Sequence, residues 1–168
     1  MHILTISGSP RAESSNTMLL QHMSQISPNH SFVHTDLPAS LPLFTPALDQ
    51  APWPEPVLML RQQVSSADAV IFCTPEYIHN IPAVLKNCLE WLTSSGELMH
   101  KKVLAMTYTP APPRGEKAMQ SLLWSLGALE ARIIASLPLY QTEVQVVNKE
   151  IQGDIETIEM ITEAFRLL

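Results

Sequence analysis

The sequence predicts an α/β protein with a doubly wound, five-stranded parallel sheet of strand order 2-1-3-4-5 and helices on both faces. Two observations carry this prediction. Five apolar segments of strand length alternate along the chain with longer patterns of helical period. The first of them is followed at once by a turn-rich stretch, GSPRAESSN, typical of the passage from a strand to a helix. The length suits one domain covering residues 1–168.

The individual elements follow from the apolar pattern. The expected strands are Ile3–Ile6, Phe32–His34, Ala69–Thr74, Val103–Tyr108 and Ile133–Leu137. The expected helices run from about Met18 to Ile26, Pro56 to Val64, Ile81 to Leu92, Glu116 to Leu126 and Ile151 to Leu167. Asn80 and Pro82 suit the start of the third helix. The last helix is expected to lie on the sheet through one apolar face, formed by Ile151, Ile155, Ile158, Ile161 and Phe165.

Residues 37–56 contain six prolines and little periodicity. This composition predicts a surface connection between the second strand and the second helix, because neither flank could close a core alone. A proline-rich segment that docks into an aromatic groove is the alternative interpretation, and the plain loop is favoured.

Three loops are expected to meet at the carboxyl ends of the first, third and fourth strands. They are Ser7–Asn16, Pro75–Asn80 and Thr107–Arg114. The first loop offers a helix N-terminus, the guanidinium of Arg11 and several short polar side chains, a combination that attracts a phosphate. Ser and Asn are also ordinary helix caps, so the stretch alone does not prove a phosphate site. With an aromatic residue on the second loop, the pocket suits a flat phosphorylated molecule such as flavin mononucleotide (FMN).

Composition argues against several classes of partner. The formal charge is −6, and no run of basic residues exceeds the pair Lys101 and Lys102, so nucleic acid and anionic membranes are not expected partners. No apolar run approaches the roughly 18 residues that span a bilayer, and we expect a cytoplasmic protein. Cys73 and Cys88 are expected to be reduced core residues, and the scattered histidines predict no metal site.

Two motifs resemble the NADPH-dependent FMN reductases, a family of flavodoxin-like fold that includes quinone, azo-dye and chromate reductases. The first is GSPRAESSN, and the second is PEYIHNIPAVLKNCLEWL. The second matches the family pattern in register at Pro75, Glu76, Tyr77, Ile81, Pro82, Leu85, Lys86 and Asn87. The resemblance covers most of the chain up to about Leu92.

The resemblance implies an enzyme in which FMN carries the chemistry and no side chain is a nucleophile. A hydride from NADPH or NADH would pass to FMN and then to a quinone, flavin, azo compound or similar small acceptor. The residues that would hold the FMN phosphate are Ser9, Arg11, Ser14, Ser15 and Asn16. Those that would line the flavin ring are Pro75, Glu76, Tyr77, Ile78 and Thr107, with Tyr77 either stacking on it or packing beside it. Glu76 is expected to bind a neighbouring backbone or subunit.

Two departures from the family pattern keep other functions open. Ile78 replaces the usual Asn, and the third loop contains Pro110, Pro112 and Pro113 in place of a glycine-rich segment. Proline has no N–H to donate to the flavin. A non-catalytic FMN-binding or regulatory module and an electron carrier of flavodoxin type are therefore the alternatives.

The resemblance also implies a homodimer or homotetramer. Trp91, Met119 and Trp124 lie beside the apolar stripes of their expected helices, which leaves large side chains for another surface.

Overall fold

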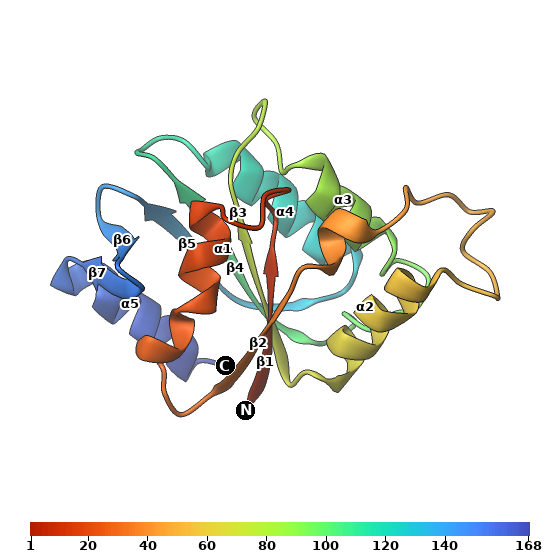
Figure 1. The fold of residues 1–168 in the computed structure, drawn as a ribbon, viewed down its shortest axis with the longest axis horizontal. Helices are drawn as coiled ribbons and strands as arrows, with labels where there is room; N and C mark the ends of the chain where they lie inside the picture. The colour runs from red at the N-terminus through yellow and green to blue at the C-terminus, as the bar shows by residue number, and fades with distance from the viewer.

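The computed structural model describes all residues 1–168 and contains the expected sheet (Figure 1). Its parallel strands are ordered β2-β1-β3-β4-β5, with bounds His2–Ser7 (β1), Ser31–Thr35 (β2), Ala69–Thr74 (β3), Lys102–Thr109 (β4) and Arg132–Tyr140 (β5). The helices are Ser15–Gln21 (α1), Glu55–Ser66 (α2), Ala83–Glu90 (α3), Glu116–Ala128 (α4) and Ile155–Arg166 (α5). Two short 3₁₀ turns, Met23–Gln25 and Leu37–Ser40, flank β2. The predicted fold class and strand order are confirmed.

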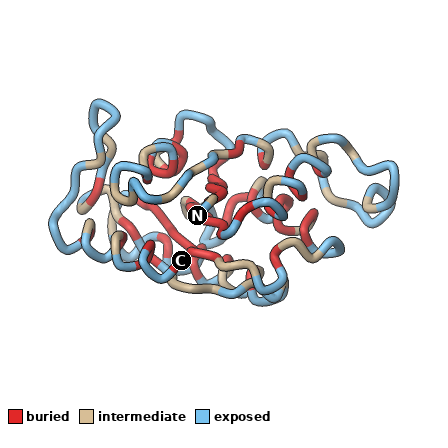
Figure 2. Tube along the Cα trace, turned by 90° about the horizontal axis from the view of Figure 1, so that it is seen from below, coloured by how far each residue is buried: buried red, intermediate tan, exposed pale blue.

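Two apolar layers hold the helices to the sheet, because successive side chains of a strand point to opposite faces. Leu4 and Ile6 of β1 pack with α2, α3 and α4 in one layer. Ile3 of the same strand packs with α1 and α5 in the other. The central strand β3 is buried along its whole length, and Figure 2 shows the buried segments in the middle of the molecule with exposed loops around them.

Two helices begin later than predicted. The third starts at Ala83, because Asn80 belongs to a tight turn and Pro82 keeps an extended backbone. The last starts at Ile155, because Ile151 lies in an unpredicted hairpin of Val144–Val147 (β6) and Glu150–Gly153 (β7). Ile155 is 76% exposed, and the helix packs through the remaining members of the predicted face, Ile158, Ile161 and Phe165. Ile151 and Ile155 are four residues apart, a spacing that fits one face of a helix, although the first lies in a strand. Periodicity alone does not separate these two cases.

The proline-rich connection projects from the molecule beside α2 and α3 (Figure 1). It is fixed by Arg61, which is buried and donates to the Asp49 carboxylate and to the carbonyl of Trp91. Trp91 is itself fully buried, with its indole N–H donating to the carbonyl of Pro42 and its ring edge-on to Phe44. The expectation that Trp91 is left over for another subunit is therefore wrong, because this connection covers it. Met119 is not left over either, because it is buried in the apolar layer between α4 and the sheet.

Three further features concern membrane-spanning helices, the cysteines and the chain termini. None of the helices combines the length and the apolar character that a membrane crossing requires. Cys73 and Cys88 are buried free thiols. Both chain termini lie at the lower edge of the sheet in Figure 1, opposite the edge where the three loops meet.

Candidate functional site

The loop after β1 is pressed against the end of β3. Gly8 donates to the carbonyl of Cys73 over 2.8 Å. A Cβ at this position would lie 2.5 Å from Oγ1 of Thr74 and 2.8 Å from Cδ2 of Leu85, so only glycine fits. Ser14 then caps α1, because its hydroxyl accepts the N–H of Thr17. The sequence thus forms a short turn that delivers the start of α1 to the carboxyl edge of the sheet.

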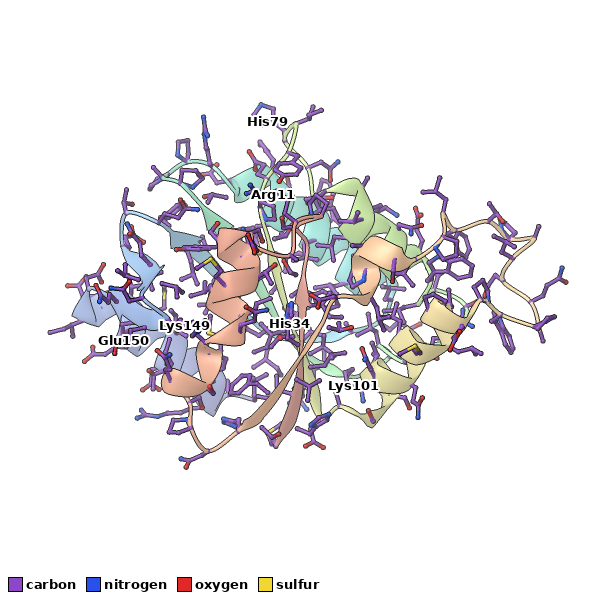
Figure 3. The ribbon with its side chains drawn as sticks, viewed as in Figure 1. Arg11, His34, His79, Lys101, Lys149 and Glu150 are labelled. Atoms are coloured by element: carbon purple, nitrogen blue, oxygen red, sulfur yellow. The ribbon has the colours of Figure 1, made fainter.

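This turn offers unpaired hydrogen-bond donors. The backbone N–H groups of Ser15 and Asn16 have no acceptor in the protein, as expected at a helix start. Arg11 is exposed and has no carboxylate partner, and Figure 3 shows it at the upper edge of the sheet, on the same side as His79. The side chain of Asn16 is occupied, because it donates to the carbonyl of Tyr108 and accepts from the thiol of Cys73. The backbone N–H of Asn16 is its unpaired donor at the start of the helix.

Glu76 joins the second loop to the third. One carboxylate oxygen accepts the backbone N–H groups of Gly115, Lys117 and Ala118 over 3.0–3.1 Å, at the start of α4. A negative charge there is stabilised by the helix dipole and by three otherwise unpaired donors. The sequence-based expectation that Glu76 binds a neighbouring backbone is confirmed, and the contact fixes the spacing between these two loops.

The tip of the second loop is a tight turn between Tyr77 and Asn80, whose backbones pair with each other. Its two central residues, Ile78 and His79, have φ values of 51° and 56°. A β-branched residue rarely adopts this left-handed region, where Asn is tolerated better. The side chain of Ile78 is 98% exposed and does not line the cleft described below. Only its backbone is available to a ligand, and Tyr77 remains as the aromatic side chain of this loop.

The third loop differs from the sequence-based expectation. Thr107 is fully buried, and its hydroxyl lies under Gly115 without a hydrogen-bond partner, so it does not face the cleft. The lining of the cleft comes from the next residues along the chain, including Thr109, Pro110 and Arg114. The Thr109 hydroxyl donates to the carbonyl of Arg114 over 2.8 Å, which closes the loop on itself.

These three loops line an open cleft of about 210 Å³ at the switch point of the sheet. Eight of the ten residues expected in the site line it, namely Ser9, Arg11, Ser14, Ser15, Asn16, Pro75, Glu76 and Tyr77. Five further residues line the cleft: Tyr108, Thr109, Pro110 and Arg114 belong to the expected third loop, and only Gln141 lies outside the three expected loops. Gln141 directly follows β5. Had the predicted strand been extended from Leu137 to Tyr140, Gln141 would have been placed at the carboxyl edge of the sheet, beside the three loops.

The electrostatics of the cleft favour an anion at one end. Arg11 and the free N–H groups of α1 are donors, whereas the carboxylate of Glu76 is occupied by α4. Burial raises the pKa of Tyr108 to about 12, so its phenol stays neutral and donates to the carbonyl of Val144. Burial also raises the pKa of the Cys73 thiol, which stays protonated. These residues fit a phosphate monoester, and the ring of Tyr77 lies on the wall of the same cleft.

Comparison with known proteins agrees with this geometry. Residues 1–142 match the family described as NADPH-dependent FMN reductase. The chain belongs to this family. The expected FMN cofactor and the NADPH or NADH donor are thereby confirmed for the family, as is its character as a group of reductase enzymes.

Individual relatives differ in how much of them is matched. The chain is 31% identical over 139 residues to the quinone reductase of Escherichia coli K12, which is 80% of this chain and 73% of that protein. It is 37% identical over 102 residues to a subunit of the NADH:(hydroxy)cinnamate reductase of Vibrio ruber, which is 61% of this chain and half of that protein. The flavoenzyme NAD(P)H:(acceptor) oxidoreductase of Paracoccus denitrificans superposes with a TM-score of 0.79 at 21% identity, covering 99% of this chain and 94% of that one, and shows the same fold.

Proposed function

We propose that the protein is an NAD(P)H-dependent, FMN-containing oxidoreductase. It would pass a hydride from nicotinamide to FMN and then reduce a quinone, a flavin, an azo compound or a similar small acceptor. The main support is the cleft at the switch point, where a phosphate-binding end and a loop bearing Tyr77 face each other. Membership of the family supports the same reaction class.

The residues of the cleft divide the binding task. Arg11 and the N–H groups of Ser15 and Asn16 would hold the phosphate, with hydroxyls of Ser9, Ser14 and Ser15 beside them. The backbone of Pro75 to Ile78 would border the ring. When bound, FMN supplies the hydride and electron transfer. The protein then has to orient the nicotinamide and stabilise negative charge at the edge of the flavin ring. The unpaired guanidinium of Arg114, which belongs to the third loop and lines the cleft, would provide a positive charge for this task.

The test begins with the purified protein and its visible spectrum. Our proposal expects bound FMN, bleaching by NADPH or NADH without air, and recovery of colour when a quinone is added. A yellow protein that neither donor bleaches would be a binding or regulatory module instead. Strong accumulation of a one-electron reduced form during titration would indicate a flavodoxin-type carrier.

Replacing Arg11 tests the phosphate end of the cleft. Arg11→Ala removes one or two charge-assisted hydrogen bonds that together contribute about 1.5–4 kcal/mol, so FMN affinity should fall about 10- to 1,000-fold. Riboflavin has no phosphate, and its affinity should stay the same. Fluorescence titration of the apoprotein with both ligands measures this. Equal affinities of the wild type for FMN and riboflavin would refute the phosphate site.

We also propose that the protein works in the cytoplasm as a homodimer or homotetramer. The exposed apolar surface at the tip of the second loop supports association. Ser121 of α4 bonds to Asn80 over 2.6 Å, and Trp124, one turn further along α4, is 70% exposed. Ile78 adds a second exposed apolar side chain to this region.

A further inference from the structure

Gln141, the first residue after β5, is held in place by its backbone. Its N–H donates to the carbonyl of Thr109 over 2.9 Å, and its own carbonyl accepts the side-chain amide of Gln145 over 2.5 Å. Gln141 lines both the cleft and a neighbouring hollow of about 190 Å³ between α1 and β6. It is therefore a fixed part of the wall that separates these two spaces.

The side chain of Gln141 reaches the start of α1. Its amide nitrogen donates to the hydroxyl of Ser15 over 2.9 Å, across 126 residues of sequence. An amide N–H can only donate, so the Ser15 oxygen accepts and its own proton remains available. Serine hydroxyls in helices often give that proton to a backbone carbonyl one turn earlier. Ser15 makes no such bond, and it lies on the wall of the cleft, so its proton is available to a ligand there.

We infer that Gln141 is a positioning residue for the phosphate of FMN. By occupying a lone pair of Ser15, it leaves the hydroxyl as a donor toward the anion. This inference rests on the proposed function and adds to it a residue from the far strand of the sheet. It agrees with the other groups at this end, since Arg11 and the free N–H of Asn16 are also donors. A hydrogen-bond acceptor at position 141 would capture the proton of Ser15 and turn oxygen lone pairs toward the phosphate.

The experiment measures the affinity of the apoprotein for FMN and for riboflavin in four variants. Gln141→Leu keeps the size of the side chain and removes the donor, and Ser15→Ala removes the hydroxyl. Each should weaken FMN binding about 5- to 20-fold and leave riboflavin binding unchanged, because Ser15→Ala loses a hydrogen bond to the phosphate and Gln141→Leu no longer holds that hydroxyl as a donor. The double variant should be no weaker than Ser15→Ala, since both changes act through the same hydroxyl.

Gln141→Glu, the fourth variant, tests the direction of the bond. Its carboxylate accepts from Ser15 and adds a negative charge near the phosphate, so FMN binding should weaken more than in Gln141→Leu. Riboflavin again reports whether the rest of the cleft is intact.

Gln25 provides a matched control, because its side-chain amide also joins distant parts of the chain, here the end of the α1 region and the hairpin. Its side chain donates to the carbonyl of Lys149 and accepts the N–H of Ile151, near the turn of the hairpin. Figure 3 shows Lys149 and Glu150 there, well away from Arg11. Gln25→Leu loosens the hairpin without touching Ser15, so it should leave the ratio of FMN to riboflavin affinity at the wild-type value.

The outcomes separate this inference from the proposed function. A wild type that binds FMN no better than riboflavin overturns both. A wild type that prefers FMN, with the same preference in Gln141→Leu, overturns the role of Gln141 alone. Additive effects of Ser15→Ala and Gln141→Leu, or an equal loss in Gln25→Leu, would also overturn it.

Discussion

At the scale of single residues, the cleft depends on side chains that are already engaged with the protein. Glu76, Asn16 and Gln141 each bond to a different strand end or helix start. Such contacts hold the walls at fixed positions before a ligand arrives, which lowers the cost of ordering them on binding. Arg11 and Arg114 are the free cations left to meet a ligand.

Glu76 should contribute to the stability of the fold. Its carboxylate is mostly buried and accepts three backbone N–H groups, so Glu76→Gln should lower the free energy of unfolding by about 1.5–3 kcal/mol. Urea denaturation measures this. The partly exposed Glu90, paired with Lys86, is the control, and Glu90→Gln should change stability by less than about 1 kcal/mol. Equal losses of unfolding free energy in both variants would mean that the contact of Glu76 with the start of α4 contributes no more than an ordinary surface ion pair.

At the scale of elements, the third loop is the part of the site that most departs from the family pattern. Pro110 lines the cleft, but Pro112 and Pro113 do not. The lack of a proline N–H therefore affects the wall of the cleft at Pro110 alone. Arg114 lines the same wall, with five N–H donors on its guanidinium.

Arg114 should assist the transfer of hydride. Arg114→Gln is expected to slow the anaerobic reduction of the flavin by NADPH about tenfold, because a donor near the developing charge is lost. FMN affinity should change much less, since the phosphate end is untouched. Stopped-flow bleaching gives the rate, and Lys117→Gln is the control for a nearby cation that does not line the cleft. An unchanged rate in Arg114→Gln would contradict this role, and no cation would then replace the N–H donors that the prolines lack.

At the scale of the whole molecule, stability should depend on pH through His34. This side chain lies at the end of β2, 3.1 Å from the Thr5 hydroxyl and 3.4 Å from the Asp36 carboxylate. Burial lowers the pKa of His34 below its usual value near 6.5, although Asp36 acts in the opposite direction. The unfolded chain then binds a proton at a higher pH than the folded protein does. His34 therefore supports stability above about pH 6.5, and this support is lost as the pH falls toward the folded pKa.

Urea denaturation at several pH values tests this linkage. Between pH 7 and pH 5 the wild type should lose stability more steeply than His34→Gln. His100→Gln replaces an exposed histidine and should keep the wild-type slope. A His34→Gln slope equal to that of the wild type would contradict the assignment.

Association of subunits is the second property of the whole molecule that can be measured. If the surface around Trp124 joins two copies, Trp124→Glu should reduce the mass in light scattering to the 18.7 kDa of one chain. Leu43→Glu changes an exposed apolar residue of the proline-rich connection and should leave the mass unchanged. A wild type that is already monomeric at micromolar concentration would reject the proposal.

The sequence by itself determined the order of the strands, the turn from β1 into α1 and the family, because these depend on local periodicity and on short contiguous motifs. The backbone contact of Glu76 could be predicted for the same reason. Only the tertiary structure decided that Trp91 is covered by its own chain, that Thr107 is buried while Arg114 lines the cleft, and that Gln141 reaches Ser15. These contacts join residues tens of positions apart, and which side of a loop faces a cavity depends on packing that no local pattern records.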